Sequence, residues 1–170
     1  GFVIIPDPET EELLRKLSEK YSQEGDILPN PHHLSLYHGH IKNVPESVAA
    51  DLTEQMSFLL GTTYSLNQIE PYGRKFLFWN VEKSYPQLQR AHETVVERLS
   101  PFVDQEKVGL ALKEGLNMSK QETDNLKKYS YPLVKDLFLP HYALLYRERG
   151  VDNIDSRQHQ ARITEVQFVE

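Results

Sequence analysis

The chain has 170 residues, which is enough for one domain with a sizeable core. A hydrophobic fraction of 39% is ordinary for a globular protein and excludes a disordered chain, and a net charge of −6 argues against a broad basic face for duplex nucleic acid. The chain contains no cysteine, which excludes disulfides, thiolate nucleophiles and cysteine-type zinc sites, and mildly favours the cytoplasm.

The ends and apolar runs of the chain indicate no membrane partner. No apolar run approaches the roughly 18 residues of a membrane span. The start, GFVIIPDPETEE, has no basic flank and is not typical of a signal peptide. The first residue is Gly and not Met, so the natural chain can be longer. We expect a cytoplasmic protein, and although the sequence does not fix the oligomeric state we expect a monomer.

The first part of the chain alternates between strand and helix patterns. Residues 2–5 (FVII) predict a buried strand. Asp7 is a suitable helix cap and Pro8 a suitable first helical residue, so a helix should follow and end at Gly25. Residues 33–41 (HLSLYHGHI) predict the next strand.

The middle of the chain continues this alternation. Pro45 should begin a second helix that stops at Gly61. Residues 64–70 and 75–82 predict two strands joined at the turn PYG as a hairpin. A third helix is expected after Pro86.

The last third contains a polar stretch and two more strands. Residues 104–131 are rich in Lys, Glu, Asn and Gln, and Ser119 with Glu122 fits a capping box. We interpret this stretch as an elaboration outside the core that could act as a lid. Residues 137–146 and 161–169 predict strands. The two halves of the chain therefore share a pattern in which a helix leads to a strand that carries a histidine.

The two histidine strands carry the chemistry. Side chains alternate faces along a strand, so His33, Ser35 and Tyr37 should share one face. The same alternation puts His141 and Ala143 together. Each strand thus presents an imidazole on one face and buries the neighbouring side chains on the other.

Two imidazoles can divide acid and base work because they titrate near neutral pH. Cleavage of a phosphodiester without a metal needs this division: a neutral His33 or His141 accepts the proton of the attacking hydroxyl or water, and the other, protonated, gives a proton to the leaving oxygen. A hydroxyl such as that of Ser35 can hydrogen-bond a non-bridging phosphate oxygen. The residues leave open which histidine is the acid and which is the base.

The motifs His33-Leu34-Ser35-Leu36 and His141-Tyr142-Ala143-Leu144 resemble the paired H-x-[ST]-x signature of the two-histidine (2H) phosphoesterases, which include the RNA 2′,5′-ligase-like enzymes and the cyclic phosphodiesterases. The opening strand FVIIPD and the stretch GRKFLFWNVEKSYPQLQRAHETVVERL extend the resemblance to most of the chain outside 104–131.

The resemblance implies an α+β fold in which two pseudo-symmetric lobes of antiparallel sheet, with outer helices, flank a central cleft within a single domain, 1–170. It also implies a phosphodiesterase that needs no metal or other cofactor. The substrate would be a small nucleotide or an RNA terminus with a 2′,3′-cyclic phosphate or a 2′,5′ linkage. Ala143 departs from the signature because it cannot hydrogen-bond a phosphate oxygen. This departure leaves three readings open: a nearby group substitutes for the hydroxyl, the activity is weak, or the protein has lost catalysis and only binds.

Further residues are candidates for holding the substrate. Arg74 and Lys75, beside Tyr72, could hold a phosphate and stack a base, or could form a solvated turn. Tyr37 could line the cleft or pack in the core. Phe78 and the neighbouring Trp are expected to pack in the core, and the sequence indicates no partner for the histidines at 92 and 159.

A metal site is the alternative that the histidine cluster raises. Imidazole is a common metal ligand, and the cluster consists of His32, His33, His38 and His40. His33 has the opposite strand parity to His38 and His40, and no Asp or Glu lies within the segment. We therefore expect no metal, and a His-rich metal-binding or interaction domain stays as the third possibility.

Overall fold

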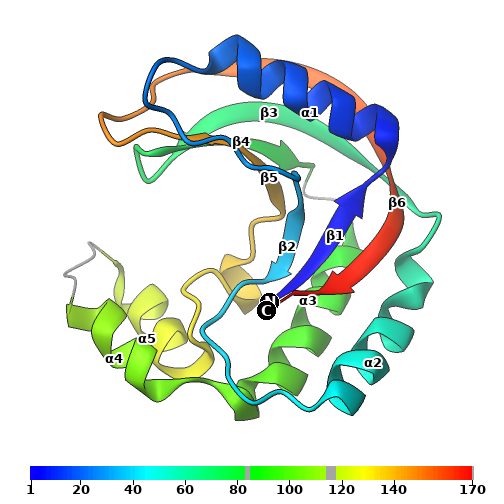
Figure 1. Ribbon diagram of the computed structural model, residues 1–170, viewed down its shortest axis with the longest axis vertical. Helices are drawn as coiled ribbons and strands as arrows, with labels where there is room; N and C mark the ends of the chain where they lie inside the picture. Colours follow the sequence, from blue (N-terminus) through cyan, green and yellow to red (C-terminus); the bar gives the residue numbers. More distant parts are fainter. Residues whose placement is uncertain (83–84, 114–117, 170) are drawn as a thin grey trace.

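The computed structural model describes residues 1–82, 85–113 and 118–169, which form an α+β fold around one ring of strands (Figure 1). In the described residues the ring contains six strands, namely β1 (Phe2–Pro6), β2 (Leu34–Tyr37), β3 (Thr63–Tyr72), β4 (Phe76–Val81), β5 (His141–Tyr146) and β6 (Asp155–Phe168). Each strand pairs antiparallel with two others in the order β1-β2-β5-β4-β3-β6, and β6 returns to β1, so the ring is a closed barrel.

Helices surround this ring. The α-helices are α1 (Pro8–Tyr21), α2 (Glu46–Gln55), α3 (Pro86–Leu99), α4 (Gln105–Lys113) and α5 (Lys120–Tyr129). Three short 3₁₀ helices accompany them, η1 (Met56–Leu59), η2 (Ser100–Phe102) and η3 (Lys135–Leu137). Helix α1 contacts β5, which begins at His141, and helix α3 contacts β2, which directly follows His33, so each of these two strands is supported by a helix (Figure 1).

Local sequence signals account for several boundaries. The Asp7 carboxylate accepts a hydrogen bond from the backbone N–H of Thr10 at 3.0 Å, which caps α1 as expected. Ser119 and Glu122 form a complete capping box at the start of α5. The β3–β4 hairpin turns at Gly73, whose φ of 56° suits a residue without a side chain.

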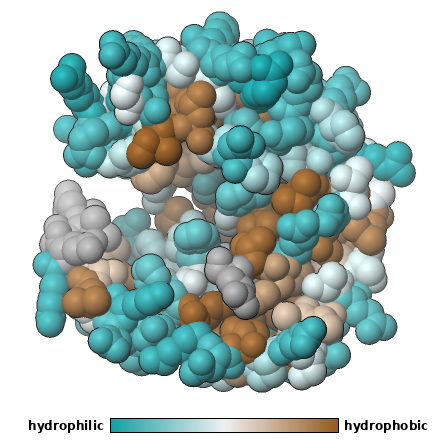
Figure 2. All heavy atoms as spheres, in the orientation of Figure 1, coloured by the Kyte–Doolittle hydropathy of each residue, from teal (hydrophilic) through white to brown (hydrophobic). Residues whose placement is uncertain are grey.

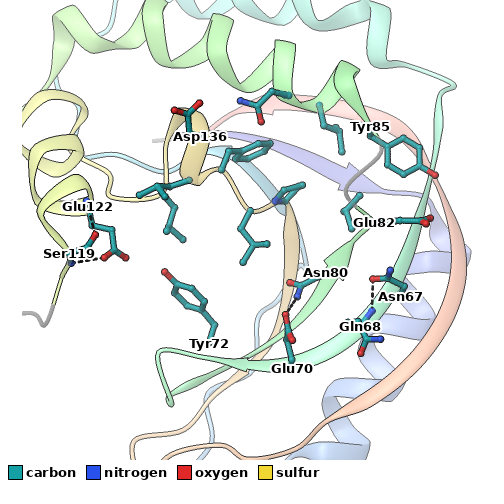
Figure 3. A pocket seen from close by; sticks show the side chains of 18 residues that line it. Asn67, Gln68, Glu70, Tyr72, Asn80, Glu82, Tyr85, Ser119, Glu122 and Asp136 are labelled. Carbon is teal, nitrogen blue, oxygen red and sulfur yellow. Dashed lines mark hydrogen bonds between the residues drawn. The ribbon is translucent and has the colours of Figure 1, made fainter.

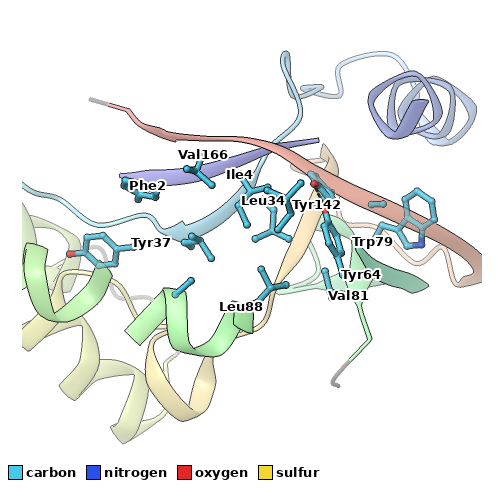
Figure 4. Close-up of a cluster of buried hydrophobic side chains, with 14 of the residues drawn as sticks. Phe2, Ile4, Leu34, Tyr37, Tyr64, Trp79, Val81, Leu88, Tyr142 and Val166 are labelled. Carbon is cyan, nitrogen blue, oxygen red and sulfur yellow. Dashed lines mark hydrogen bonds between the residues drawn. The ribbon is translucent and has the colours of Figure 1, made fainter. Parts of the chain in front are cut away.

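The core lies inside the ring and under the helices (Figure 4). Tyr64 and Tyr142, from β3 and β5, are almost completely buried, and their hydroxyl groups hydrogen-bond each other. Helix α3 adds an apolar face at helical spacing, consisting of Leu88, Ala91, Val95, Val96 and Leu99. Because buried apolar area is the main favourable term in folding, this shared interior fixes β2, β4 and β5 relative to one another.

The expected elements are largely confirmed, but two strands are shorter than the sequence pattern indicated. Of the predicted strand 33–41, only the residues of β2 form a strand. The predicted strand 137–146 begins only at His141, because η3 extends to Leu137 and irregular chain follows it. The α+β class and the antiparallel pairing are confirmed. The six strands form one closed ring, and the two pseudo-symmetric lobes stay a prediction.

The polar stretch 104–131 packs more closely than expected. It forms α4 and α5, and Tyr129 at the end of α5 belongs to the buried core cluster. The Asn125 side chain donates hydrogen bonds to the carbonyls of Pro132 and Val134, which ties α5 to the segment before β5. In the part of the chain that the structure describes, no helix has the length and apolar character needed to cross a membrane.

Candidate active site

The pairing of β2 with β5 brings the two histidine motifs together. Leu34 lies opposite Tyr142 in this antiparallel pair. In the same register Ser35 lies opposite His141, and His33 is the diagonal neighbour of His141 on the same face. Leu34 and Tyr142 are fully buried, whereas the other three are only half-buried. The alternation that the sequence predicted is therefore present, with both imidazoles on the more open face.

The two imidazoles are held in the same way. His33 Nδ1 donates to the carbonyl oxygen of Pro31 at 3.3 Å, and His141 Nδ1 donates to that of Leu139 at 2.6 Å. A carbonyl can only accept, so in the neutral rings Nδ1 carries the hydrogen and Nε2 keeps its lone pair. Each histidine thus turns the nitrogen that can exchange a proton away from its own backbone.

His141 lies deep among protein atoms although its ring keeps some exposed surface. Phe78 of β4 stacks on it, with ring centroids 3.6 Å apart and planes inclined by 18°. Burial lowers the pKa of His141 to about 4, the hydrogen bond to Leu139 opposes this effect, and the nearby His33 adds to it. His141 is therefore neutral at pH 7.

When the Leu34–Tyr142 register is continued by one residue beyond the start of β2, Ala143 lies opposite His33, at the position where the 2H signature has a hydroxyl residue. It is half-buried and lies directly across from Phe78 on β4. Ser35 is therefore the one hydroxyl that the two motifs contribute to this face.

A cavity of about 1010 Å³ opens next to the histidine face (Figure 3). Its wall includes Pro140 and Asn80, which are neighbours of His141 along the chain and across the β4–β5 pair, but not His141 itself. It lies between the β3–β4 hairpin and the segment that runs from α5 to β5, where the molecule is visibly hollowed (Figure 2). Tyr72 lines it and stacks on Phe78, with centroids 4.9 Å apart. Burial, together with the nearby Glu122, raises the pKa of Tyr72. Of the predicted substrate-holding side chains beyond Ser35, Tyr72 is the one placed against the histidine face.

Tyr37 is a core residue and does not line the cavity, although it has the expected parity. It is completely buried, and its hydroxyl donates to the Tyr129 carbonyl at 2.5 Å. Tyr131 packs edge-on against its ring. Of the two alternatives that the sequence left open for Tyr37, the structure has core packing, because the end of α5 covers this part of the face.

Arg74 and Lys75 are not close to the histidines. They lie in the β3–β4 turn, whereas Asn80 is the β4 residue paired with His141. Five residues of strand separate Lys75 from Asn80, which corresponds to roughly 16 Å. Lys75 forms an ion pair with Glu148 at 2.5 Å. The alternative of a solvated turn describes these two residues better than a phosphate site.

The histidines of the cluster at 32–40 do not come together as a group of three or more potential metal ligands. His32 is buried and hydrogen-bonds Ser18 through Nε2 and Glu11 through Nδ1, at 2.9 Å each, which anchors the chain before β2 onto α1. His38 and His40 are exposed. Among residues 1–82, 85–113 and 118–169, no group of three or more His, Asp or Glu side chains could hold a metal ion.

His92, for which the sequence indicated no partner, anchors the segment before β5. Its Nδ1 donates to the Leu36 carbonyl at 2.5 Å, and its Nε2 accepts from the Lys135 backbone N–H at 2.8 Å. Phe138 stacks on the ring with centroids 3.9 Å apart. His32 and His92 thus play matching roles, because each fixes the segment that leads into one of the two histidine strands. The sequence alone could not show these roles, because the hydrogen-bond partners of both histidines come from distant segments of the chain.

Comparisons with known proteins give a fold but no family. No protein-family model matches the sequence, and neither does any curated protein. Among solved structures, the crystal structure of TT0787 of Thermus thermophilus is similar, with a TM-score of 0.64 over 97% of this chain and 84% of that chain. The sequence identity is 14%, so the likeness shows that the two proteins share a fold.

Proposed function

We propose that this protein is a metal-independent phosphodiesterase that acts on a small RNA-type or nucleotide phosphodiester, such as a 2′,3′-cyclic phosphate or a 2′,5′ linkage. The observation that carries this proposal is the antiparallel pairing of Leu34 with Tyr142. That pairing puts His33, Ser35 and His141 on one half-open face, with both Nδ1 atoms held by backbone carbonyls. A cytoplasmic location and a small nucleotide or RNA-terminus partner belong to the same proposal.

The spacing of the two rings suits a single phosphate. Diagonal neighbours in an antiparallel pair lie about 7–8 Å apart at their Cα atoms, so two imidazoles on one face can flank one phosphorus. In this scheme each of two lobes supplies one histidine. The same contact occurs in both lobes, namely a hydrogen bond from the imidazole Nδ1 to the backbone carbonyl two residues earlier. This repeat is the support for pseudo-symmetric lobes around a cleft.

The lowered pKa favours His141 as the base. Being neutral at pH 7, its Nε2 can accept the proton of an attacking water while that oxygen forms a bond to phosphorus. His33, in its protonated form, gives its Nε2 proton to the leaving ester oxygen as the P–O bond breaks. The products are a phosphomonoester and a free hydroxyl, and the base and acid have exchanged protonation states. Ser35 donates a hydrogen bond to a non-bridging oxygen as charge increases there.

A binding module is the second candidate, and Ala143 favours it. A missing hydroxyl on this face removes a donor that would stabilise the transition state. Such a protein would hold a nucleotide or RNA terminus by the same residues without turnover. The distinction between the two candidates is therefore kinetic, and a turnover assay separates them.

The proposal is tested by assaying 2′,3′-cyclic nucleotides, 2′,5′-linked oligonucleotides and cyclic dinucleotides, each with and without EDTA. We expect turnover of at least one class that EDTA leaves unchanged. H33A and H141A should each abolish it, while the matched control H40A, at an exposed histidine outside the pair, should retain it. Circular dichroism and thermal unfolding would show that each variant is folded.

The outcomes divide the candidates clearly. Turnover within tenfold of wild type in folded H33A or H141A would contradict the acid–base pair. Binding of these compounds without turnover would support the module instead. Activity or stability that EDTA removes would support the metal-binding alternative and overturn the proposal.

A further inference from the structure

Asn80 is a buried polar residue next to His141, and only one of the two polar atoms of its side-chain amide has a hydrogen-bond partner among the described residues. It is 6% exposed and lies directly across β4–β5 from His141. Its Nδ2 donates to Glu70 Oε1 at 2.6 Å, while its Oδ1 has no hydrogen-bond partner in the part of the chain that the structure describes. A carboxylate oxygen can only accept, so this orientation of the amide follows from Glu70. A buried acceptor without a donor requires an explanation, and a ligand is one.

Asn80 faces the cavity of about 1010 Å³ together with acceptor groups from other elements (Figure 3). Carboxylates line it from several sides, namely those of Glu70, Glu82, Glu122 and Asp136. These groups and Asn80 Oδ1 can accept hydrogen bonds, and their negative charge opposes the entry of an anion. The cavity is therefore suited to a group that donates hydrogen bonds and carries no negative charge.

The same cavity has an apolar portion that suits a flat organic group. Leu88, Val81 and Phe138 contribute to it, and Tyr72 and Tyr85 present aromatic rings. Tyr72 is already part of a stack that continues through Phe78 to His141, so a ring bound near Tyr72 would lie close to the proposed reaction site. Apolar walls with a few polar groups are typical of small-molecule sites.

We propose that this cavity holds the organic group attached to the reacting phosphate, and that this group is uncharged and bears hydrogen-bond donors, as a nucleoside with an amino-bearing base or a free sugar hydroxyl does. The inference rests on the proposed function, because it places the phosphate at His33 and His141. It narrows the substrate class to nucleosides with a single phosphate at the reacting position, and it disfavours a further phosphate that would enter the cavity.

The donor is identified with matched ligands. Calorimetry on H33A, which should bind without turnover, would compare cytidine 2′,3′-cyclic phosphate with its uridine counterpart, which lacks the amino group. A 5′-deoxy analogue of the cytidine compound would test the sugar hydroxyl. We expect either the loss of the amino group or the loss of the 5′-hydroxyl to weaken binding by about tenfold, which corresponds to about 1.4 kcal/mol of binding free energy. The additional substitution N80L should abolish that discrimination, because it removes the acceptor.

The charge of the cavity is tested with a second pair of ligands. A 5′-phosphorylated cytidine 2′,3′-cyclic phosphate should bind at least about tenfold more weakly than the 5′-hydroxyl compound. The penalty should shrink in E82Q and D136N, and should stay the same in the matched control E54Q on α2. Equal or tighter binding of the 5′-phosphorylated compound would overturn the inference, as would unchanged binding and discrimination in folded N80L.

These measurements separate the inference from the proposed function. If cyclic phosphates are turned over by His33 and His141 but N80L and the charge variants change nothing, the function stands and the inference is wrong. If no compound is turned over but unphosphorylated cytidine binds to wild type and N80L weakens that binding, the cavity assignment stands and the catalytic proposal is wrong.

Discussion

The imidazole of His141 lies flat against the ring of Phe78, with centroids 3.6 Å apart. Phe78 is itself almost buried and also stacks on Tyr72. An apolar ring pressed onto an imidazole keeps water from the face of the ring, which disfavours the charged form. The low pKa of His141, and with it the proposed role as base, therefore depends on a residue that belongs to neither histidine motif.

Replacement of Phe78 by Ala should raise the pKa of His141 from about 4 toward its ordinary value of 6.5, because water would reach the ring. The acid limb of the activity profile should then move to higher pH, so that the activity at pH 5 relative to pH 7 falls by about twofold if the pKa rises to 5 and by about tenfold if it rises to 6. NMR titration of the imidazole would measure the pKa directly. F78L, which keeps an apolar side chain, should shift the profile less. An unchanged profile in F78A would show that Phe78 only packs.

The hydroxyl groups on the histidine face should have unequal effects on turnover. S35A should lower kcat by about 10²–10³ because it removes a donor to the phosphate in the transition state. A143T should raise kcat, since it adds a hydroxyl opposite His33 at a half-buried strand position where a β-branched residue fits. Steady-state kinetics on both variants measure this. No gain in A143T, with a loss in S35A, would mean that Ser35 alone supplies the hydrogen bond.

His92 should make the fold sensitive to acid. Burial lowers its pKa to about 4, below the 6.5 of the unfolded chain, so the unfolded state binds more protons between these values. The stability is fully present above pH 6.5 and is lost as pH falls toward 4, by about 3 kcal/mol for this one group. Urea unfolding at several pH values would measure the slope.

The variant H92L separates this effect from packing. At pH 7 it should cost about 2 kcal/mol, because the Leu36 carbonyl and the Lys135 N–H lose their partner. The stability gap between wild type and H92L should narrow as pH falls, since only wild type has this histidine to protonate. A gap that widens toward pH 4 would contradict the assignment.

The sequence was sufficient to predict which side chains share the histidine face, because the alternation of side chains along a strand depends only on neighbouring residues. Strand alternation placed His33, Ser35 and His141 correctly relative to their buried neighbours, and Asp7 and Ser119 marked helix starts through capping chemistry that is local to a few residues. These signals need no knowledge of how distant segments pair.

The remaining features depend on long-range register. Asn80 and Phe78 reach His141 only because β4 pairs with β5 in one particular register, which neither strand pattern specifies. Tyr37 has the right parity but is covered by a helix from a stretch expected to lie outside the core. Arg74 and Lys75 are only a few residues before Asn80 in the sequence. They nevertheless lie at the turn end of β4, whereas Asn80 and the histidine face lie at its other end.

Arg147 should be a sensitive point for stability, because it joins the end of β5 to the end of α1. Its Nε and Nη2 donate to the two carboxylate oxygens of Asp26 at 2.8 and 2.7 Å, and Nη2 also donates to the Tyr21 carbonyl at 2.9 Å. The side chains of Arg147 and Asp26 are 11% and 3% exposed. R147L should lower the free energy of unfolding by about 3 kcal/mol, since it leaves a buried carboxylate unpaired.

A double-mutant cycle tests whether the pair itself carries this effect. D26L combined with R147L replaces both charges by apolar groups, which is often far less costly than the loss of one partner. We therefore expect the double variant to be more stable than R147L alone, as measured by urea unfolding. R147K should recover only part of the loss, because lysine cannot reproduce the two parallel hydrogen bonds. A double variant that loses the sum of the two single effects would show that Asp26 and Arg147 act independently.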